Sequence, residues 1–148
     1  MQYKYASQLN VLTLKLTQCP CQAATPRTDV AYRLAWQPAE DAKNFIPRPL
    51  VPGVKRRIET NARPLTETEA KKLEDEACDE WAISLHTNPT ASRWVMKRYP
   101  ILGYTDVVEI KLSEQLGTCT PTDHHQHFNL HETAGTDLRA AITQVQPL

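Results

Sequence analysis

Five prolines lie within 27 residues of this chain, at positions 38, 47, 49, 52 and 64. Proline has no backbone N–H and moves the residue before it out of the α region, so a long helix cannot form there. We therefore predict an irregular but ordered loop over residues 38–64, held to the domain by four apolar side chains: Phe45, Ile46, Leu50 and Val54. A loop of this length in a small domain is often functional.

Two strands are predicted before this loop. Residues 9–17 alternate leucines with polar residues, which is typical of a strand with one buried face. Residues 18–29 contain two prolines and no periodicity, so they form a connector. Residues 30–36 are largely apolar on both faces, which predicts a central strand. The chain thus divides into an N-terminal strand and linker, residues 1–28, and a domain, residues 29–148.

The segment after the loop has the clearest helix signals. Thr66 and Glu69 match a capping box, and an apolar stripe predicts a helix over residues 67–81. Asn88 followed by Pro89 is typical of a helix start, and this second helix runs to about residue 98. A short strand is predicted at 82–86, and alternation predicts two further strands at 106–112 and 127–132. For the C-terminal tail the sequence is compatible with two structures: a short helix that Thr136 caps, or a strand over residues 142–145.

These elements predict an α+β fold. We expect a single small domain with a mixed, mostly antiparallel sheet, two or three helices and the long proline-rich loop. The 148 residues are 41% hydrophobic, which is enough for one core. The longest apolar runs are too short to cross a bilayer, so we expect no membrane partner.

Charge is neutral in sum but segregated along the chain. The 17 basic and 17 acidic residues argue against a general polyanion binder. Residues 43–63 contain six basic residues and one acid, whereas residues 66–80 contain seven acids and two lysines. Either these segments attract each other as solvated surfaces, or Lys55, Arg56 and Arg57 form a phosphate-binding edge for a nucleotide or nucleic acid. Nucleic acid is less favoured, because aromatic residues are not interleaved with the basic ones.

The four cysteines, Cys19, Cys21, Cys78 and Cys119, do not have the spacing of a small secreted scaffold. The first residues carry no signal-peptide pattern, so we expect a cytoplasmic chain with reduced thiols. The Cys-Pro-Cys sequence at Cys19 would need two further ligands to bind a metal, and it is a weaker signal than paired CxxC motifs.

Four of the five histidines lie close together in the C-terminal quarter. On a strand, His127 and His131 would be about 13 Å apart, too far for one metal ion to bind both. His125 and His127 would need a further ligand, such as Cys119 or His86. No metal is therefore favoured, and the cluster is either a polar active-site rim or a solvated loop.

Three short segments carry residues that suit one kind of catalysis. Arg33, preceded by Tyr32, lies within an early strand; Ser84 lies in a later strand, before a capped helix; Glu132 ends the last of them. This order resembles the Arg–Ser–Glu arrangement of ADP-ribosyltransferase-like domains. The serine segment reads Ser-Leu-His-Thr where the family has Ser-Thr-Ser, and Leu130 stands where the family has glutamate or glutamine.

The resemblance implies a domain that binds NAD or a related nucleotide and transfers ADP-ribose or cleaves NAD. It implies that Arg33 and Tyr32 hold the cofactor, and that Ser84 and His86 line the nicotinamide pocket. Glu132 would polarise the ribose so that the glycosidic bond breaks. A carboxylate there stabilises the positive charge that builds on the ribose carbon.

Other functions compete with this one. The small size and the bipolar segment 43–80 also suit a non-catalytic protein-interaction subunit or regulator of a larger bacterial assembly, whose partner would cover that segment. A serine or cysteine hydrolase is not favoured. The chain has no GxSxG elbow, and Cys78 lies on or beside the apolar side of a helix.

Overall fold

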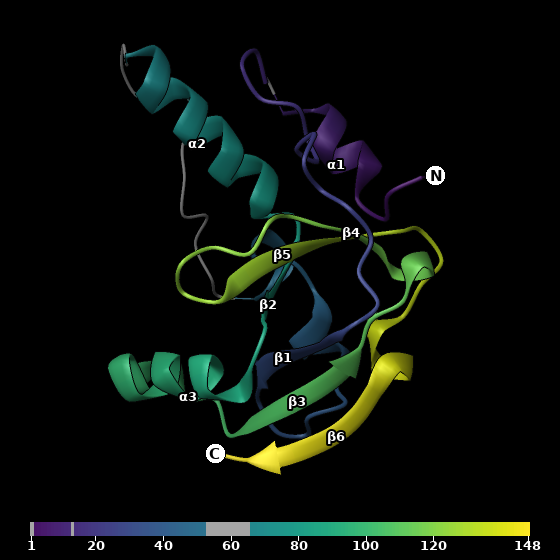
Figure 1. Ribbon diagram of the computed structural model, residues 1–148, viewed down its shortest axis with the longest axis vertical. Coiled ribbons are helices and arrows are strands. Elements are labelled where there is room, and N and C mark those ends of the chain that lie inside the picture. The colour runs from purple at the N-terminus through teal and green to yellow at the C-terminus, as the bar shows by residue number, and fades with distance from the viewer. Residues whose placement is uncertain (1, 13, 53–65) are drawn as a thin grey trace.

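In the part of the chain that the structure describes, six strands form one antiparallel sheet in the order β4-β5-β2-β1-β3-β6 (Figure 1). This computed structural model describes residues 2–12, 14–52 and 66–148. The strands are β1 (Val30–Ala35), β2 (Ile83–His86), β3 (Asp106–Lys111), β4 (Gly117–Cys119), β5 (His127–Glu132) and β6 (Ile142–Pro147). The helices are α1 (Ala6–Asn10), α2 (Glu67–Asp79) and α3 (Pro89–Arg98), with short 3₁₀ turns at η1 (Ala42–Phe45), η2 (Arg48–Leu50), η3 (Pro100–Leu102), η4 (Glu114–Leu116) and η5 (Leu138–Ala141). The predicted α+β class is confirmed.

The sheet consists of two three-stranded parts, which we call ladders, that are joined at a single residue pair between β1 and β2. β1 pairs with β3 along its whole length, from Val30 to Ala35. Between β1 and β2, by contrast, the described residues pair only at Tyr32 and His86. The ladders β4-β5-β2 and β1-β3-β6 therefore diverge on either side of this pair. The candidate site lies where the two ladders separate, since residues of both β1 and β2 line it.

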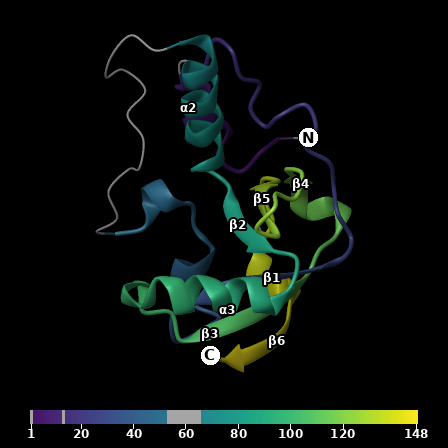
Figure 2. The ribbon, with the colours of Figure 1, turned by 60° about the vertical axis from the view of Figure 1, so that its left-hand side comes forward.

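The two faces of the sheet differ, because only one of them carries the hydrophobic core. Ile83 and Leu85 of β2 and Phe128 of β5 are buried on one face, which carries the hydrophobic core. The proline-rich loop closes over this core through Phe45 of η1. Helix α3 packs against β1, β2 and β3 at the end of the molecule away from α2 (Figure 2). Alternation along β2 thus separates a core face from a face that is open to a ligand.

The N-terminal segment differs from its prediction. Helix α1 replaces the start of the strand expected at residues 9–17, and the described residues of that range pair with no other strand. The chain instead runs beside α2 (Figure 1), where the Glu74 carboxylate accepts the backbone N–H groups of Lys15 and Leu16. The strand prediction is wrong because these backbone donors are satisfied by a helix side chain rather than by a neighbouring strand.

A disulfide joins this N-terminal segment to α2. It links Cys19 to Cys78, whereas Cys21 and Cys119 are free thiols. The prediction of a fully reduced chain is therefore wrong for this structure. Residues 1–28 are also tied to the sheet, since a β-bridge joins Thr25 to Cys119.

The helix and strand predictions after the loop are confirmed. Both predicted helix caps are present: the Thr66 hydroxyl accepts the N–H of Glu69 at 3.2 Å, and the Asn88 side chain accepts that of Ala91 at 2.8 Å. The C-terminal tail forms both of the predicted alternatives, since the short helical turn η5 is followed by strand β6. Asp137, rather than Thr136, caps η5. Strand β4 was not predicted.

Among the described helices, none combines the length and the apolar character needed to span a bilayer.

We expect Thr66→Ala to lower the free energy of unfolding by about 1 kcal/mol, because the first turn of α2 loses its side-chain acceptor. Thr66→Ser keeps the hydroxyl and should change stability by less than about 0.5 kcal/mol. Urea unfolding followed by circular dichroism measures both variants. Equal losses in the two variants would argue against a capping role.

Candidate functional site

A cleft of about 1050 Å³ opens where β1 and β2 diverge. Its floor comes from β2 and β5, and one wall comes from α3 and the η3 turn. The other walls come from the proline-rich loop and the C-terminal part of α2. Because Ile83 and Leu85 point into the core, alternation along β2 directs Ser84 and His86 into the cleft.

Arg33 lies where the two strands separate. Its Nε donates to the carbonyl of Asn44 and its Nη1 to the carbonyl of Ser84, both at 2.6 Å. The guanidinium therefore links β1 to β2 at a place where backbone pairing has stopped. Burial lowers the pKa of Arg33 from its usual value, and the charges of Tyr104 and Glu132 oppose this effect. Arg33 both lines the cleft and holds its base together.

Asn44 holds the loop that forms one wall. Its side chain is buried, and it accepts the N–H of Trp36 at 2.8 Å. The same amide donates to the carbonyls of Trp36, Pro38 and Ala39. This network closes the chain into a compact turn and places Trp36 and Lys43 on the cleft.

Ser84, His127 and Asp123 form a hydrogen-bonded row across the floor. Ser84 Oγ lies 2.6 Å from His127 Nε2, and His127 Nδ1 lies 3.3 Å from Asp123 Oδ2. The other oxygen of Asp123 accepts the backbone N–H groups of His125 and His127, which orients the carboxylate. Burial raises the pKa of Asp123, but these hydrogen bonds and the charge of His127 bring it below its usual value. In this order of groups, the imidazole can take the hydroxyl proton.

His86 lies beside this row. Its ring centroid is 5.7 Å from that of His127, and its Nδ1 is 2.8 Å from Ser92 Oγ. Burial, followed by the charge of His127, lowers the pKa of His86 to about 4. The imidazole is therefore neutral at pH 7 and offers a ligand an uncharged hydrogen-bonding group.

The pKa of His86 predicts a loss of stability in mild acid. The unfolded chain binds a proton at His86 near pH 6.5, whereas the folded chain does so only near pH 4. The unfolded state therefore holds more protons between these values, and stability falls as pH falls through that window. Unfolding midpoints from pH 7 to pH 4 should fall less in His86→Gln than in the wild type. His124→Gln, an exposed control, should follow the wild-type curve, and parallel curves for all three proteins would contradict the prediction.

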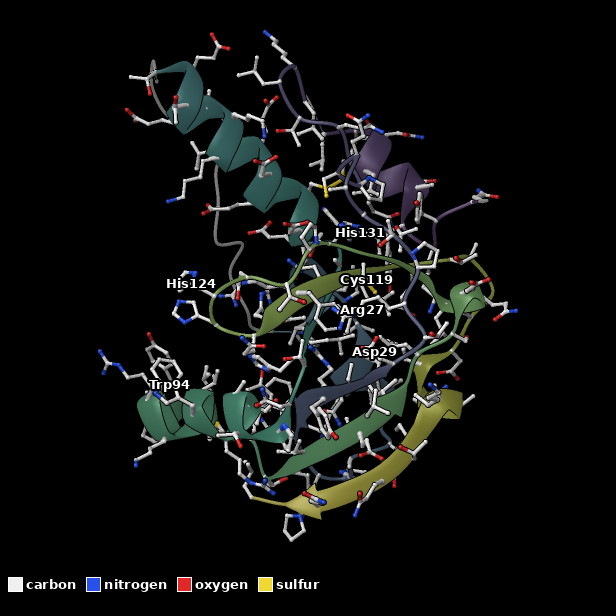
Figure 3. The ribbon with its side chains drawn as sticks, in the orientation of Figure 1. Arg27, Asp29, Trp94, Cys119, His124 and His131 are labelled. Carbon is white, nitrogen blue, oxygen red and sulfur yellow. A yellow bond between two sulfur atoms is a disulfide. The ribbon has the colours of Figure 1, made fainter. Side chains whose placement is uncertain are left out.

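Aromatic rings from two parts of the chain line the cleft. Trp36 stacks on Tyr104 with ring centroids 4.4 Å apart and an interplanar angle of 21°. Trp94 of α3 is 52% exposed and lies nearly parallel to His125, with centroids 6.3 Å apart. Figure 3 shows Trp94 and His124 on the same side of the molecule, at the periphery. Exposed rings of this kind give a planar base a surface on which to stack.

The two oppositely charged segments both contribute side chains to the lining of the cleft. Lys43 and Arg48 line it from the proline-rich loop. The α2 side of the cleft carries three acids: Glu76, Asp79 and Glu80. The phosphate contacts predicted from the sequence, Lys55, Arg56 and Arg57, lie outside the described residues. Both charged segments therefore contribute to one site.

Glu132 does not line this cleft, contrary to the prediction. It is 2% exposed, and its Oε2 lies 2.9 Å from Lys4 Nζ, so the N-terminal segment covers it. Burial raises the pKa of Glu132, which Lys4 and Arg33 partly counter. Tyr32 is also outside the lining, and its hydroxyl donates to Glu109 Oε1 at 3.1 Å. Only part of the predicted set thus converges on the cleft.

Cys119 and the neighbouring histidines do not assemble as metal ligands. Cys119 belongs to the core, and burial raises the pKa of its thiol to about 12, so the thiol stays protonated. His124 and His125 instead lie against each other, with centroids 3.9 Å apart. Within the described chain, the three-donor group that could hold an ion is a different one: Cys19, Cys78 and His131.

Asp123, Trp94 and Lys43 were not singled out from the sequence. Asp123 had a local signal in the sequence, because an aspartate side chain often accepts the N–H of the residue two positions later in an Asx turn. Here Asp123 accepts the backbone N–H groups of His125 and His127. The other two, Trp94 and Lys43, reach the cleft only through tertiary packing.

Comparisons with protein-family models, curated proteins and solved structures find no match for this chain.

Proposed function

We propose that this cleft binds a nucleotide, with NAD as the first candidate, and that the chain acts on it as an ADP-ribosyltransferase-like enzyme. One observation carries the proposal. Arg33, Ser84 and His86, which the sequence singled out, lie in the same cleft as exposed aromatic rings and two basic side chains.

The cleft suits the parts of a dinucleotide. Its volume of about 1050 Å³ is at the upper end of ordinary ligand pockets, about 300–1,000 Å³. A planar base would stack on the exposed ring of Trp94. A diphosphate would lie near Lys43 and Arg48, because charge-assisted hydrogen bonds favour phosphate oxygens. The ribose hydroxyls would face Ser84 and His86.

Cleavage at the nicotinamide ribose requires negative charge near the carbon that becomes positive. Glu132 is buried under Lys4, so we assign this role to Asp123, whose carboxylate lies in the cleft and whose pKa is held low. His127, beside it, would accept the proton of the attacking group.

Ligand-induced stabilisation of the full chain tests the proposal. At 100 times its Kd, NAD should stabilise the fold by about 2.7 kcal/mol and raise Tm by about 5–10 °C. ADP-ribose should act like NAD if the phosphates dominate binding, whereas nicotinamide alone should act weakly. No shift with millimolar NAD or ADP-ribose would overturn the proposal.

A pair of double variants locates the binding site. Lys43→Ala with Arg48→Ala should weaken NAD binding at least about 10-fold, because both cations line the cleft. Lys97→Ala with Arg139→Ala removes the same charge from outside the cleft and should leave Kd unchanged. Equal effects of the two double variants would show that binding is only electrostatic.

The cytoplasm is the compartment that we propose for this chain. Reducing conditions there keep cysteines as thiols, so the Cys19–Cys78 disulfide would belong to an oxidised state. Alkylation in denaturant at cell lysis, which exposes the buried Cys119, followed by mass spectrometry counts the thiols. Modification of all four cysteines supports the cytoplasm, and modification of Cys21 and Cys119 alone supports an oxidising compartment.

The row of Ser84, His127 and Asp123 favours a second candidate, a serine-dependent hydrolase. In such an enzyme the serine oxygen attacks a carbonyl or phosphoryl centre while His127 takes its proton and Asp123 holds the imidazole. A fluorophosphonate probe should then label Ser84, and His127→Gln should abolish labelling. Ser113→Ala, outside the cleft, should leave labelling intact. A probe that labels no residue, or a different one, would exclude this candidate.

A further inference from the structure

A second constellation lies next to the cleft and is not used by the proposed nucleotide site. The sulfur atoms of Cys19 and Cys78 and a ring nitrogen of His131 all lie within 4.8 Å of one another. They come from the N-terminal segment, the C-terminal part of α2 and β5. Figure 3 shows His131 beside the yellow disulfide bond, between α2 and the N-terminal segment.

The distance between Cys78 and His131 is close to that of a tetrahedral metal site, whereas the two sulfur atoms are held together by their disulfide bond. Zinc binds thiolate sulfur at about 2.3 Å and imidazole nitrogen at about 2.0–2.1 Å, which places ligating S and N atoms about 3.6 Å apart. Cys78 Sγ and His131 Nε2 are 3.9 Å apart, so this edge of the tetrahedron is nearly formed. The two sulfur atoms need only separate to about 3.8 Å once their bond is broken.

The surroundings also suit an ion. His131 and Cys78 are each 2% exposed, and Cys19 is half-buried, so water reaches the group from one side. Asp79 Oδ1 lies 3.2 Å from His131 Nε2, close to the about 3.4 Å expected between nitrogen and oxygen ligands of one zinc ion. Asp79 also lines the cleft. A fourth ligand, the carboxylate or a water molecule, can therefore approach from the cleft.

We propose that, in the reduced chain, Cys19, Cys78 and His131 bind a thiophilic divalent cation such as Zn²⁺, and that disulfide formation and metal binding exclude each other. This inference goes beyond the nucleotide proposal and does not depend on it. Of the Cys-Pro-Cys sequence only Cys19 takes part, and Cys78 of α2 and His131 of β5 supply the other two donors.

A phosphine reductant can convert the oxidised chain, with its Cys19–Cys78 disulfide, into the reduced chain that binds the metal. The phosphine gives two electrons to the disulfide and takes oxygen from water, the S–S bond breaks, and the two protons of that water end on the sulfur atoms. Each thiol then loses its proton to solvent when it binds the cation. His131 binds as the neutral imidazole and gives up its hydrogen bond to Asp79.

Cobalt binding to the full chain tests the proposal. The chain is reduced with the phosphine, freed of reductant without oxygen and titrated with Co²⁺, and the oxidised chain is titrated in parallel. One equivalent should give the visible d–d bands of tetrahedral Co²⁺ together with a near-ultraviolet thiolate-to-cobalt band, and Zn²⁺ should displace it. The oxidised chain should give neither band. A reduced chain without these bands would overturn the proposal, whatever the variants do.

Variants identify the ligands. His131→Gln and Cys78→Ser should each weaken binding more than about 100-fold, beyond the 10–100-fold cost of losing an outer hydrogen-bond partner. If water is the fourth ligand, Asp79→Asn should weaken metal binding by no more than about 10–100-fold, the cost of losing an outer hydrogen-bond partner. Cys21→Ser and the double variant His124→Gln, His125→Gln are matched controls and should keep the bands. Bands that survive His131→Gln, or that vanish in the histidine control, would assign the ion to another site.

Discussion

Arg33→Ala is expected to lower the free energy of unfolding by about 2–3 kcal/mol, because two carbonyl groups lose a charged donor. The guanidinium bonds the carbonyls of Asn44 and Ser84 at 2.6 Å, where β1 and β2 no longer pair. For a domain of this size the loss corresponds to a fall in Tm of about 4–12 °C. Nucleotide binding should weaken at least about 10-fold, since the base of the cleft loses both a cation and its support.

Two further variants separate these effects. Arg33→Lys keeps the charge but cannot form the same pair of directed bonds, so it should restore part of the binding and little of the stability. Arg139→Ala removes an exposed cation that pairs with Asp137 and should leave the melting curve and the NAD affinity unchanged. Calorimetry and NAD titration measure both quantities. An Arg33→Ala protein with wild-type Tm would show that the two ladders do not depend on this bridge.

The Cys19–Cys78 disulfide is expected to contribute about 4 kcal/mol to stability. The two cysteines are 59 residues apart, and a cross-link of that span removes much of the freedom of the unfolded chain. Reduction in the presence of a metal chelator should therefore lower Tm by about 8–16 °C. The double variant Cys19→Ser, Cys78→Ser should melt at the same lowered temperature with or without reductant.

The free cysteine next to this bond is the matched control. Cys21→Ser changes a thiol in the same segment but leaves the disulfide, so its melting curve should follow the wild type and should still respond to reductant. A wild-type protein that melts identically with and without reductant would show that the bond does not constrain the chain. Zn²⁺ added to the reduced protein should recover part of the lost stability if the metal site forms.

Local patterns accounted for most of the secondary structure. The caps at Thr66 and Asn88 work through contacts within four residues, so their consequences are visible in the sequence. Alternation identified β3 and β5 because the apolar residues at every second position of these strands are buried, as Val108 and Ile110 are in β3 and Phe128 and Leu130 are in β5. Strand β1 was predicted instead from apolar residues on both of its faces. Strand β4 escaped prediction because its three residues, Gly117–Cys119, are too few to show a period.

The same reasoning failed where the partner of a segment decided its structure. The leucines at positions 12, 14 and 16 have the period of a strand, but a strand also needs a neighbour to take its backbone bonds. Glu74 takes two of those bonds instead. Glu132 was placed correctly at the end of its strand, yet the N-terminal segment covers it through Lys4 and removes it from the cleft.

The sequence alone determined the α+β class, the two capped helices, the central strands and the candidate residues Arg33, Ser84 and His86. These follow from propensity, capping and alternation, which act over a few neighbouring residues. Only the tertiary structure decided that the sheet splits beside Arg33, that His127 and Asp123 join Ser84, and that Cys19 and Cys78 meet His131. These contacts join residues up to 112 positions apart, as between Cys19 and His131, and no local pattern encodes a pairing over such a distance.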